Sequence, residues 1–234
     1  MRATAFRRAA TLVVTGTSRL LMQGLNRVKL VDPHHLHAAR RLQRPGHGLL
    51  TASNHVGLFD DPLLLACFAE PDWAQLRWVA ADAVNFFGSP GMALFSSTGK
   101  AVPVVRGAGV DQPGMAFLAE RLRQGDWVHV FPEGGRSRDA QGRLRRPLKT
   151  GLAYLVAAAR PLLLTFHHRG MHDVLPIGAR LPRVGNTVTV RFAAAVDTDA
   201  GLADQGSDAI MRHVETSLLA LEAEAFAPEG PSDR

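Results

Sequence analysis

Two hydrophobic patterns alternate along the chain. Short runs of continuous hydrophobic residues predict buried strands, and stretches with apolar residues every three or four positions predict helices. The predicted strands are 49–52, 101–105, 127–131, 162–166 and 187–196. The predicted helices are 34–44, 61–69, 111–124, 150–159 and 208–226. Because strands and helices alternate, we expect a single α/β domain in which a central mixed β-sheet is flanked by helices.

The first 30 residues carry a different pattern, in which arginines accompany an apolar stripe (Leu12, Val13, Leu20, Leu21 and Leu25). This pattern predicts an N-terminal amphipathic membrane-associated helix over 1–30, with Arg7, Arg8 and Arg19 at the lipid headgroups. An ordinary helix packed on the domain is the alternative. A mitochondrial transit peptide also fits the composition, whereas Arg19 interrupts the apolar stretch that a signal peptide would need. We then expect the main globular domain over 31–226, followed by a flexible tail over 227–234.

Charge is distributed unevenly along the chain. The total is 27 Lys and Arg against 21 Asp and Glu, but residues 1–50 hold nine basic residues and one acid, and residues 197–234 hold two basic residues and nine acids. A basic N-terminal segment predicts an acidic partner such as an anionic membrane surface. Nucleic acid is not expected, because no aromatic residues are interleaved with the basic ones. The excess of Arg over Lys is typical of a GC-rich bacterium, so we expect a bacterial inner membrane, with a mitochondrial membrane as the alternative.

Composition excludes two further classes of protein. A single cysteine, Cys67, rules out a disulfide framework. The longest uncharged stretch, 83–99, has 17 residues and is interrupted by Gly and Pro, so it is too short to span a bilayer.

The sharpest chemical signal is a histidine and an aspartate five residues apart, His55 and Asp60, where a strand gives way to a helix. On an ideal helix this spacing would place the two side chains about 140° apart, so they can meet only across an irregular turn. Gly57 would permit such a turn. A carboxylate that holds one imidazole tautomer would make His55 a general base, while an unpaired loop histidine is the alternative. Asp61 precedes Pro62 and is the predicted N-cap of the next helix.

Two glycine- and arginine-containing segments predict anion binding. In Phe131-Pro132-Glu133-Gly134-Gly135-Arg136-Ser137-Arg138, the glycines allow backbone N–H groups to approach a phosphate, and the guanidinium groups match its geometry. Arg106 follows another predicted strand and suits the same ligand. A solvated turn and an exposed strand-end arginine are the alternatives. Residues 174–178, around Pro176, could form the wall of an apolar channel, with an ordinary strand end as the alternative.

Two histidine groups resemble metal clusters, but neither has the spacing of an open metal site, and no metal is expected. They are His34, His35 and His37, and His167, His168 and His172 with Asp173.

Taken in order, these blocks resemble the glycerophospholipid acyltransferase superfamily, and in particular its tafazzin-like branch. The resemblance rests on Asn54-His55 followed by Asp60-Asp61-Pro62, on the segment from Gly99 to Val110, on Gly125 to Gly134, and on Gly170 to Pro176. It spans about residues 10–197.

The resemblance implies a function for each block. His55 would be the catalytic base and Asp60 its partner, and the substrates would be a phospholipid and a lysophospholipid, with cardiolipin remodelling as the hallmark of the branch. Substrate-binding roles would fall on Asn54, Arg106, Glu133, Gly134, Gly135, Arg136, Ser137 and Pro176. No cofactor is implied.

Two departures from the tafazzin pattern leave the acyl donor open. Gly135-Arg136-Ser137 is closer to the wider superfamily, and His167 stands where the branch tends to have tryptophan. An acyltransferase of the 1-acylglycerol-3-phosphate type, dependent on acyl-CoA or an acyl carrier, is therefore the first alternative. A catalytically idle membrane lipid-binding protein is the second.

Overall fold

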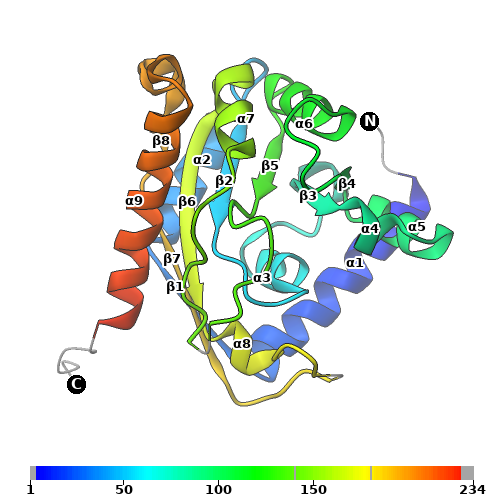
Figure 1. The fold of residues 1–234 in the computed structure, drawn as a ribbon. Coiled ribbons are helices and arrows are strands. Elements are labelled where there is room, and N and C mark those ends of the chain that lie inside the picture. Colours follow the sequence, from blue (N-terminus) through cyan, green and yellow to red (C-terminus); the bar gives the residue numbers. More distant parts are fainter. Residues whose placement is uncertain (1–3, 140, 180, 228–234) are drawn as a thin grey trace.

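The computed structural model describes residues 4–139, 141–179 and 181–227. It shows one eight-stranded mixed sheet with helices on both faces, which confirms the predicted fold class (Figure 1). The strand order is β1 (Arg27–Val31), β7 (Thr187–Phe192), β6 (Leu162–Arg169), β2 (Leu49–Ser53), β5 (Trp127–Val130), β3 (Trp78–Asp82) and β4 (Ala101–Val104). Among the described strands, β6 pairs antiparallel with β7 and with the short β8 (Val196–Asp197), and the other strand pairings are parallel.

Alternate residues of the central strands enter two cores, one on each face of the sheet. Leu50 of β2 packs with α6 (Pro113–Arg123), α7 (Gly151–Ala159) and α9 (Ser207–Phe226). Leu49, its neighbour, faces α2 (Pro33–Leu42), α3 (Asp60–Phe68) and the π-helical turn η1 (Leu20–Gly24). This alternation is what a strand buried on both faces requires.

The sheet places the functional segments at one edge. β2, β5, β3 and β4 are adjacent and parallel, so their carboxyl ends lie together. His55 follows β2, the segment from Phe131 follows β5, and Arg106 follows β4. Open sheets of this kind bind their ligands at the carboxyl ends of the strands.

Several predicted elements differ from the structure. The predicted strand 187–196 ends at Phe192, because β7 pairs with the end of β6 and β8 then pairs with its beginning. Residues 174–178 are not a strand: a helical turn, α8 (Met171–Val174), is followed by a turn closed by Ala179 N–H and Pro176 O. The sequence also did not predict β1, β3, α4 (Ala83–Phe87) or α5 (Pro90–Thr98).

The N-terminal helix is shorter than the predicted range 1–30. The helix α1 (Ala5–Arg19) continues into η1, and residues 27–31 form β1 at the edge of the sheet, parallel to β7. α1 lies against α3 and reaches α5 (Figure 1). No described helix is long and apolar enough to cross a bilayer. Apart from Ala227, the predicted flexible tail lies outside the described residues.

Candidate active site

The predicted pair of His55 and Asp60 meets in the structure. His55 Nδ1 lies 3.0 Å from Asp60 Oδ2, across an irregular turn between β2 and α3. The same carboxylate oxygen accepts hydrogen bonds from the backbone N–H groups of Val56 (2.7 Å) and Gly57 (2.8 Å). A Cβ atom on Gly57 would lie 2.6 Å from Asp60 Oδ1. Glycine is therefore needed here for space, so that the carboxylate can approach the turn.

Asp60 is held in its ionised form. The carboxyl is completely buried, and burial alone would raise its pKa, but His168, the hydrogen bond from His55 and the Gly57 N–H together lower the pKa below its ordinary value. A carboxylate on Nδ1 retains the proton on that nitrogen. Nε2 of His55 is then the nitrogen that can accept a proton from a substrate.

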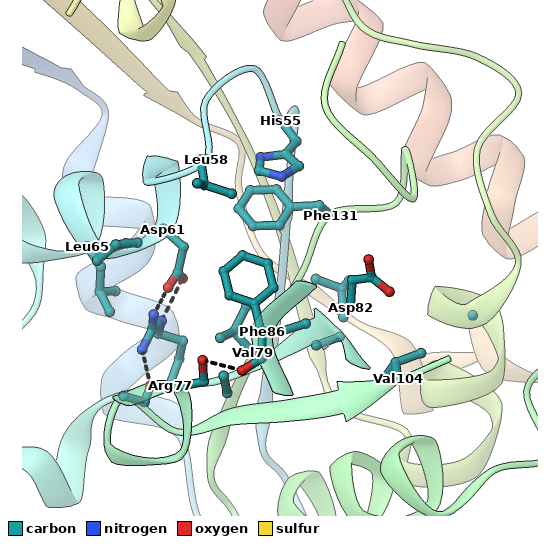
Figure 2. Close-up of a pocket in the computed structure, with 18 of the residues that line it drawn as sticks. His55, Leu58, Asp61, Leu65, Arg77, Val79, Asp82, Phe86, Val104 and Phe131 are labelled. Carbon is teal, nitrogen blue, oxygen red and sulfur yellow. Dashed lines mark hydrogen bonds and ion pairs between the residues drawn. The ribbon is translucent and has the colours of Figure 1, made fainter. Parts of the chain in front are cut away.

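The His55 ring is fixed on its other side by Phe131. The two rings stack with their centroids 4.0 Å apart and their planes 19° apart, and the His55 side chain is 14% exposed (Figure 2). His55 is thus held at the surface of a cavity, with its orientation set by a carboxylate and an aromatic ring.

Two predicted substrate-binding residues, Glu133 and Ser137, hydrogen-bond the backbone of the His55 turn, and their role in substrate binding stays a prediction. The carboxylate of Glu133 accepts hydrogen bonds from the N–H groups of His55 (2.5 Å) and Arg145 (2.8 Å). Burial raises the pKa of Glu133 to about 7, although these two hydrogen bonds oppose the shift. Ser137 donates its N–H to His55 O (2.6 Å) and its hydroxyl to Arg143 O (2.6 Å). Both side chains are buried within the protein.

Asn54 is also buried, and it joins β2 to β6. Its side-chain amide donates to His168 O and accepts from His168 N–H, both at 2.9 Å. The imidazole of His168 lies close as well, with Nε2 2.9 Å from Asn54 O. His168 Nε2 is also 3.7 Å from Asp60 Oδ2. His168 was noted from the sequence only as part of a metal-like cluster. In the described part of the chain, no group of three or more His, Cys, Asp or Glu could hold a metal ion.

A cavity of about 860 Å³ opens beside His55 and runs between the sheet and the N-terminal helix (Figure 2). Apolar and small residues from α1, α3, β3 and α5 form part of its wall, among them Val14, Leu65, Ala66, Val79, Ala80 and Phe95. Its volume and its largely apolar lining suit a hydrocarbon chain. One buried ion pair interrupts this wall, in which Arg77 Nε donates to Asp61 Oδ1 (2.7 Å).

That ion pair corrects the predicted role of Asp61. The helix α3 begins at Asp60, its N-cap residue is Phe59, and no side chain caps it. Asp61 is instead the partner of Arg77, which is fully buried and whose pKa is lowered to about 9 by burial. The buried guanidinium needs a charged partner, and this need outweighs capping.

The end of the cavity near His55 carries basic residues. Arg106, Gly134, Gly135 and Lys149 line it, and the Arg145 guanidinium lies against Gly135. Gly134 has φ +65°, and a Cβ there would lie 2.8 Å from Lys149 Cγ. Arg106 is half exposed and 3.7 Å from Asp82. The predicted residues Arg136 and Pro176 do not line this cavity, so any role for them in substrate binding stays a prediction.

The sequence assigned no role to Lys149, Arg145 or Arg77, and Phe131 entered only as the first residue of the predicted anion-binding segment. Lys149 and Arg145 lack any local motif and are brought to Gly134 and Gly135 by a loop that returns past β5, where Lys149 N–H bonds Pro132 O (2.7 Å). A run of basic residues from Arg143 to Lys149, close after the glycines, was the one available signal.

The site combines an imidazole that can act as a base, its carboxylate partner, a cavity that fits a hydrocarbon chain, and a cationic rim. These are the components that acyl transfer between lipid molecules requires. The chain belongs to the acyltransferase family, whose model matches residues 27–179.

Individual relatives agree with this assignment. The chain is 30% identical to a tafazzin of Drosophila melanogaster over 80% of its length, and 31% identical to a tafazzin of Dictyostelium discoideum over 68%. It is 37% identical to an N-acylphosphatidylethanolamine synthase of Arabidopsis thaliana over 56%. The chain spans about half the length of these relatives (50%, 57% and 48%). The resemblance to the tafazzin-like branch is thereby confirmed.

A solved structure supports the fold. The 1-acyl-sn-glycerophosphate acyltransferase PlsC of Thermotoga maritima superposes with a TM-score of 0.68, covering 97% of this chain and 85% of that one at 19% identity. The α/β architecture is therefore that of a known acyltransferase.

Proposed function

We propose that the protein is a membrane-associated O-acyltransferase that moves an acyl chain from a phospholipid to the hydroxyl of a lysophospholipid, as a tafazzin-like transacylase. The observation that carries the proposal is the His55–Asp60 pair at the edge of the apolar cavity. The resemblance to the tafazzin-like branch favours a phospholipid as the donor.

In the proposed reaction, His55 Nε2 takes the proton from the acceptor hydroxyl as its oxygen attacks the ester carbonyl of the donor. Asp60 stabilises the imidazolium that forms. The ester bond of the donor breaks, its oxygen receives the proton from His55, and the acyl chain leaves on the acceptor. No bond to the protein forms, because the base activates a hydroxyl of the substrate itself.

The basic end of the cavity would hold the lipid phosphate. Arg106 and Lys149 line the cavity near His55, and Arg145 lies against Gly135. Guanidinium groups match phosphate oxygens in geometry, and Lys149 adds a mobile charge. In this arrangement the acyl chain occupies the apolar part of the cavity, and the ester lies between the two ends, beside His55.

We also propose that the protein acts at a membrane surface, in a bacterial inner membrane or, as the alternative, a mitochondrial membrane. The basic N-terminal segment supports this proposal, since each basic residue near an anionic surface contributes about 1 kcal/mol.

The donor is tested with purified protein, phosphatidylcholine labelled in its acyl chains, and monolysocardiolipin, without CoA. Label should appear in the cardiolipin product. If label moves only when acyl-CoA replaces the labelled phospholipid, the acyl-CoA-dependent alternative is correct. If no acyl group moves from either donor while lipid still binds, the protein is the idle lipid-binding alternative.

A second candidate differs in the acceptor atom. Over 139 residues, 37% identity to a protein named N-acylphosphatidylethanolamine synthase favours acyl transfer to the amine of a phosphatidylethanolamine. The same assay distinguishes the candidates when phosphatidylethanolamine replaces monolysocardiolipin. An alkali-stable labelled product would be the amide, whereas an ester product is cleaved by mild alkali.

A further inference from the structure

Asp82 is a carboxylate at the cationic end of the cavity, and the proposed reaction does not use it. It is the last residue of β3, and it pairs with Val104 of the neighbouring strand β4, two residues before Arg106. Its side chain is 7% exposed and lines the cavity. Asp82 is also the N-cap residue of α4, but its side chain does not cap that helix. Local structure therefore gives no reason for a carboxylate at this position.

The contacts of the Asp82 carboxylate with described residues involve one of its two oxygens. Oδ2 accepts a hydrogen bond from Asn85 Nδ2 and lies 3.7 Å from Arg106 Nη1. The second distance is too long for a hydrogen bond, so Arg106 keeps its donors for another partner. Oδ1 has no hydrogen bond or ion pair with a described residue. One oxygen of a charged carboxylate can thus accept a ligand.

Arg106 belongs at the same time to a cationic cluster around two glycines. A Cβ atom on Gly135 would lie 3.2 Å from Arg145 Nη1 and 3.9 Å from Arg106 Nη1, and Lys149 lies against the preceding glycine. Three basic side chains therefore converge on this loop, which suits a phosphate. Asp82 places a negative charge at the edge of the cluster, beside Arg106.

The other carboxylates that line the cavity within the described residues are placed differently. Asp61 is the partner of buried Arg77. Glu70 follows the carboxyl end of α3, whereas His55 precedes the beginning of that helix. Asp82 is thus the carboxylate that combines a position at the cationic end with an oxygen that is not engaged.

We propose that Asp82 forms a subsite for the ammonium group of a zwitterionic phospholipid headgroup, whose phosphate is held by Arg106 and its basic neighbours. In an ethanolamine headgroup, two carbon atoms separate the ammonium group from the phosphate ester oxygen. Adjacent opposite charges on the lipid then face adjacent opposite charges on the protein. Phe86, one helical turn after Asp82, also lines the cavity, and the face of an aromatic ring attracts a cation (Figure 2).

This inference deepens the proposed function and rests on it for the substrate class. It also separates two kinds of headgroup by charge. A phosphate monoester carries a charge of about −1.5 to −2 at pH 7, whereas a phosphodiester carries about −1. The carboxylate of Asp82 repels the additional negative charge of a monoester and attracts the ammonium group of a zwitterion. Removal of its charge should therefore have opposite effects on the two headgroups.

The test is calorimetric titration of the full chain with alkyl ether lysophospholipids that share a decyl chain, below their critical micelle concentrations. Their headgroups are phosphoethanolamine, phosphoglycerol and the phosphate monoester. An ether has no ester carbonyl, so binding is measured without turnover. Asp82→Asn removes the charge at nearly constant size. The matched control, Glu70→Gln, removes one charge from the other end of α3. Melting temperatures of all proteins are compared first.

Wild type should bind the ethanolamine lipid more tightly than the glycerol lipid, although a purely cationic site would favour the glycerol lipid for its net negative charge. Equal or reversed affinities would overturn the inference without any variant. Asp82→Asn should weaken the ethanolamine lipid at least about tenfold, the scale of a hydrogen bond to a charged group. It should leave the glycerol lipid within about threefold of wild type and bind the monoester more tightly. Glu70→Gln should leave all three within about threefold.

Two results with the variants would contradict the subsite. Equal losses for the ethanolamine and glycerol lipids in Asp82→Asn would mean that Asp82 merely orients Arg106. An equal loss of the ethanolamine lipid in Glu70→Gln would mean that any negative charge in the cavity suffices.

Failure of the proposed function would look different. If no acyl transfer occurs in any assay but the preference for the ethanolamine lipid depends on Asp82, the subsite stands and the proposed reaction is wrong. If acyl transfer occurs and the headgroup preference does not depend on Asp82, the reaction stands and the subsite is wrong.

Discussion

Asp60 and Asp61 are neighbours in the sequence, but their carboxylates lie in different surroundings. Asp60 turns back onto the His55 loop, where one oxygen serves the imidazole and two backbone N–H groups. Asp61 points across the cavity wall to Arg77. We therefore expect Asp60 to act in catalysis and Asp61 to act in the stability of the fold.

Asp60→Asn should lower the rate of acyl transfer by about two to four orders of magnitude, the loss seen when a catalytic histidine loses its carboxylate partner. The reason is that a neutral amide cannot stabilise the imidazolium. The measurement is the initial rate of label transfer, with circular dichroism to verify the fold. A rate within about tenfold of wild type would remove Asp60 from the chemistry.

Asp61→Asn should instead destabilise the protein, because Arg77 would remain buried without its charged partner. Breaking one side of a buried pair costs about 3–5 kcal/mol, which for a chain of this size lowers the melting temperature by at least about 6 °C. The double variant Asp61→Asn/Arg77→Gln removes both charges and should recover part of the loss. An unchanged melting temperature for Asp61→Asn would restore the capping role that the sequence predicts.

Glu133 gives the stability a pH dependence. Burial raises the pKa of Glu133 in the folded protein from the ordinary glutamate value of 4.5 to about 7. The folded state therefore binds more protons than the unfolded state between these values, and the contribution of Glu133 to stability falls as the pH rises. Glu133→Gln does not titrate. The melting temperature of wild type relative to Glu133→Gln should decrease from pH 5 to pH 8, and a constant or increasing difference would contradict the assignment.

At the scale of elements, α1 is attached to the domain through Arg19. The Arg19 guanidinium donates to the carbonyl oxygens of Ala66 (2.7 Å) and Ala69 (2.9 Å) at the carboxyl end of α3. A cation at this position satisfies free carbonyl groups and favours the helix dipole. The sequence predicts Arg19 at the lipid headgroups, but in the structure its side chain links α1 to the end of α3.

Arg19→Ala should lower the free energy of unfolding by about 1–3 kcal/mol, since two charge-assisted hydrogen bonds are lost. Arg8→Ala, on the exposed side of the same helix, should change it by less than about 0.5 kcal/mol. Chemical denaturation measures both. If Arg19→Ala leaves stability unchanged but weakens binding to anionic vesicles more than Arg8→Ala does, Arg19 is a headgroup ligand after all.

The sequence predicted elements with strong periodicity and missed those defined by their neighbours. The helix 208–226 and the strand 49–52 were found because each buries a regular set of apolar residues, such as Ile210, Val214 and Leu218. β1 is an edge strand with a mixed pattern, and its pairing with β7 depends on residues 160 positions away. The exposed apolar residues of α4 and α5 have no core-facing pattern, so their helices gave no signal.

At the scale of the whole molecule, the cavity is built from segments far apart in the sequence. α1, α3, β3, α5 and the segment after β5 each contribute part of its wall. Local reasoning identified the His55–Asp60 pair because both residues lie in one turn. It could not identify Lys149 or Arg77, whose positions depend on long-range folding. The resemblance assigns Glu133 and Asn54 to substrate binding, which stays a prediction, and in the structure their polar side chains hydrogen-bond the backbone.

The most direct test of the account is the initial rate of acyl transfer from labelled phosphatidylcholine to monolysocardiolipin without CoA, compared between wild type and His55→Ala. Wild type should transfer label, and His55→Ala should be slower by at least about a thousandfold with an unchanged melting temperature and unchanged vesicle binding. A folded, lipid-bound His55→Ala protein that transfers label at the wild-type rate would contradict the central claim that His55 is the base.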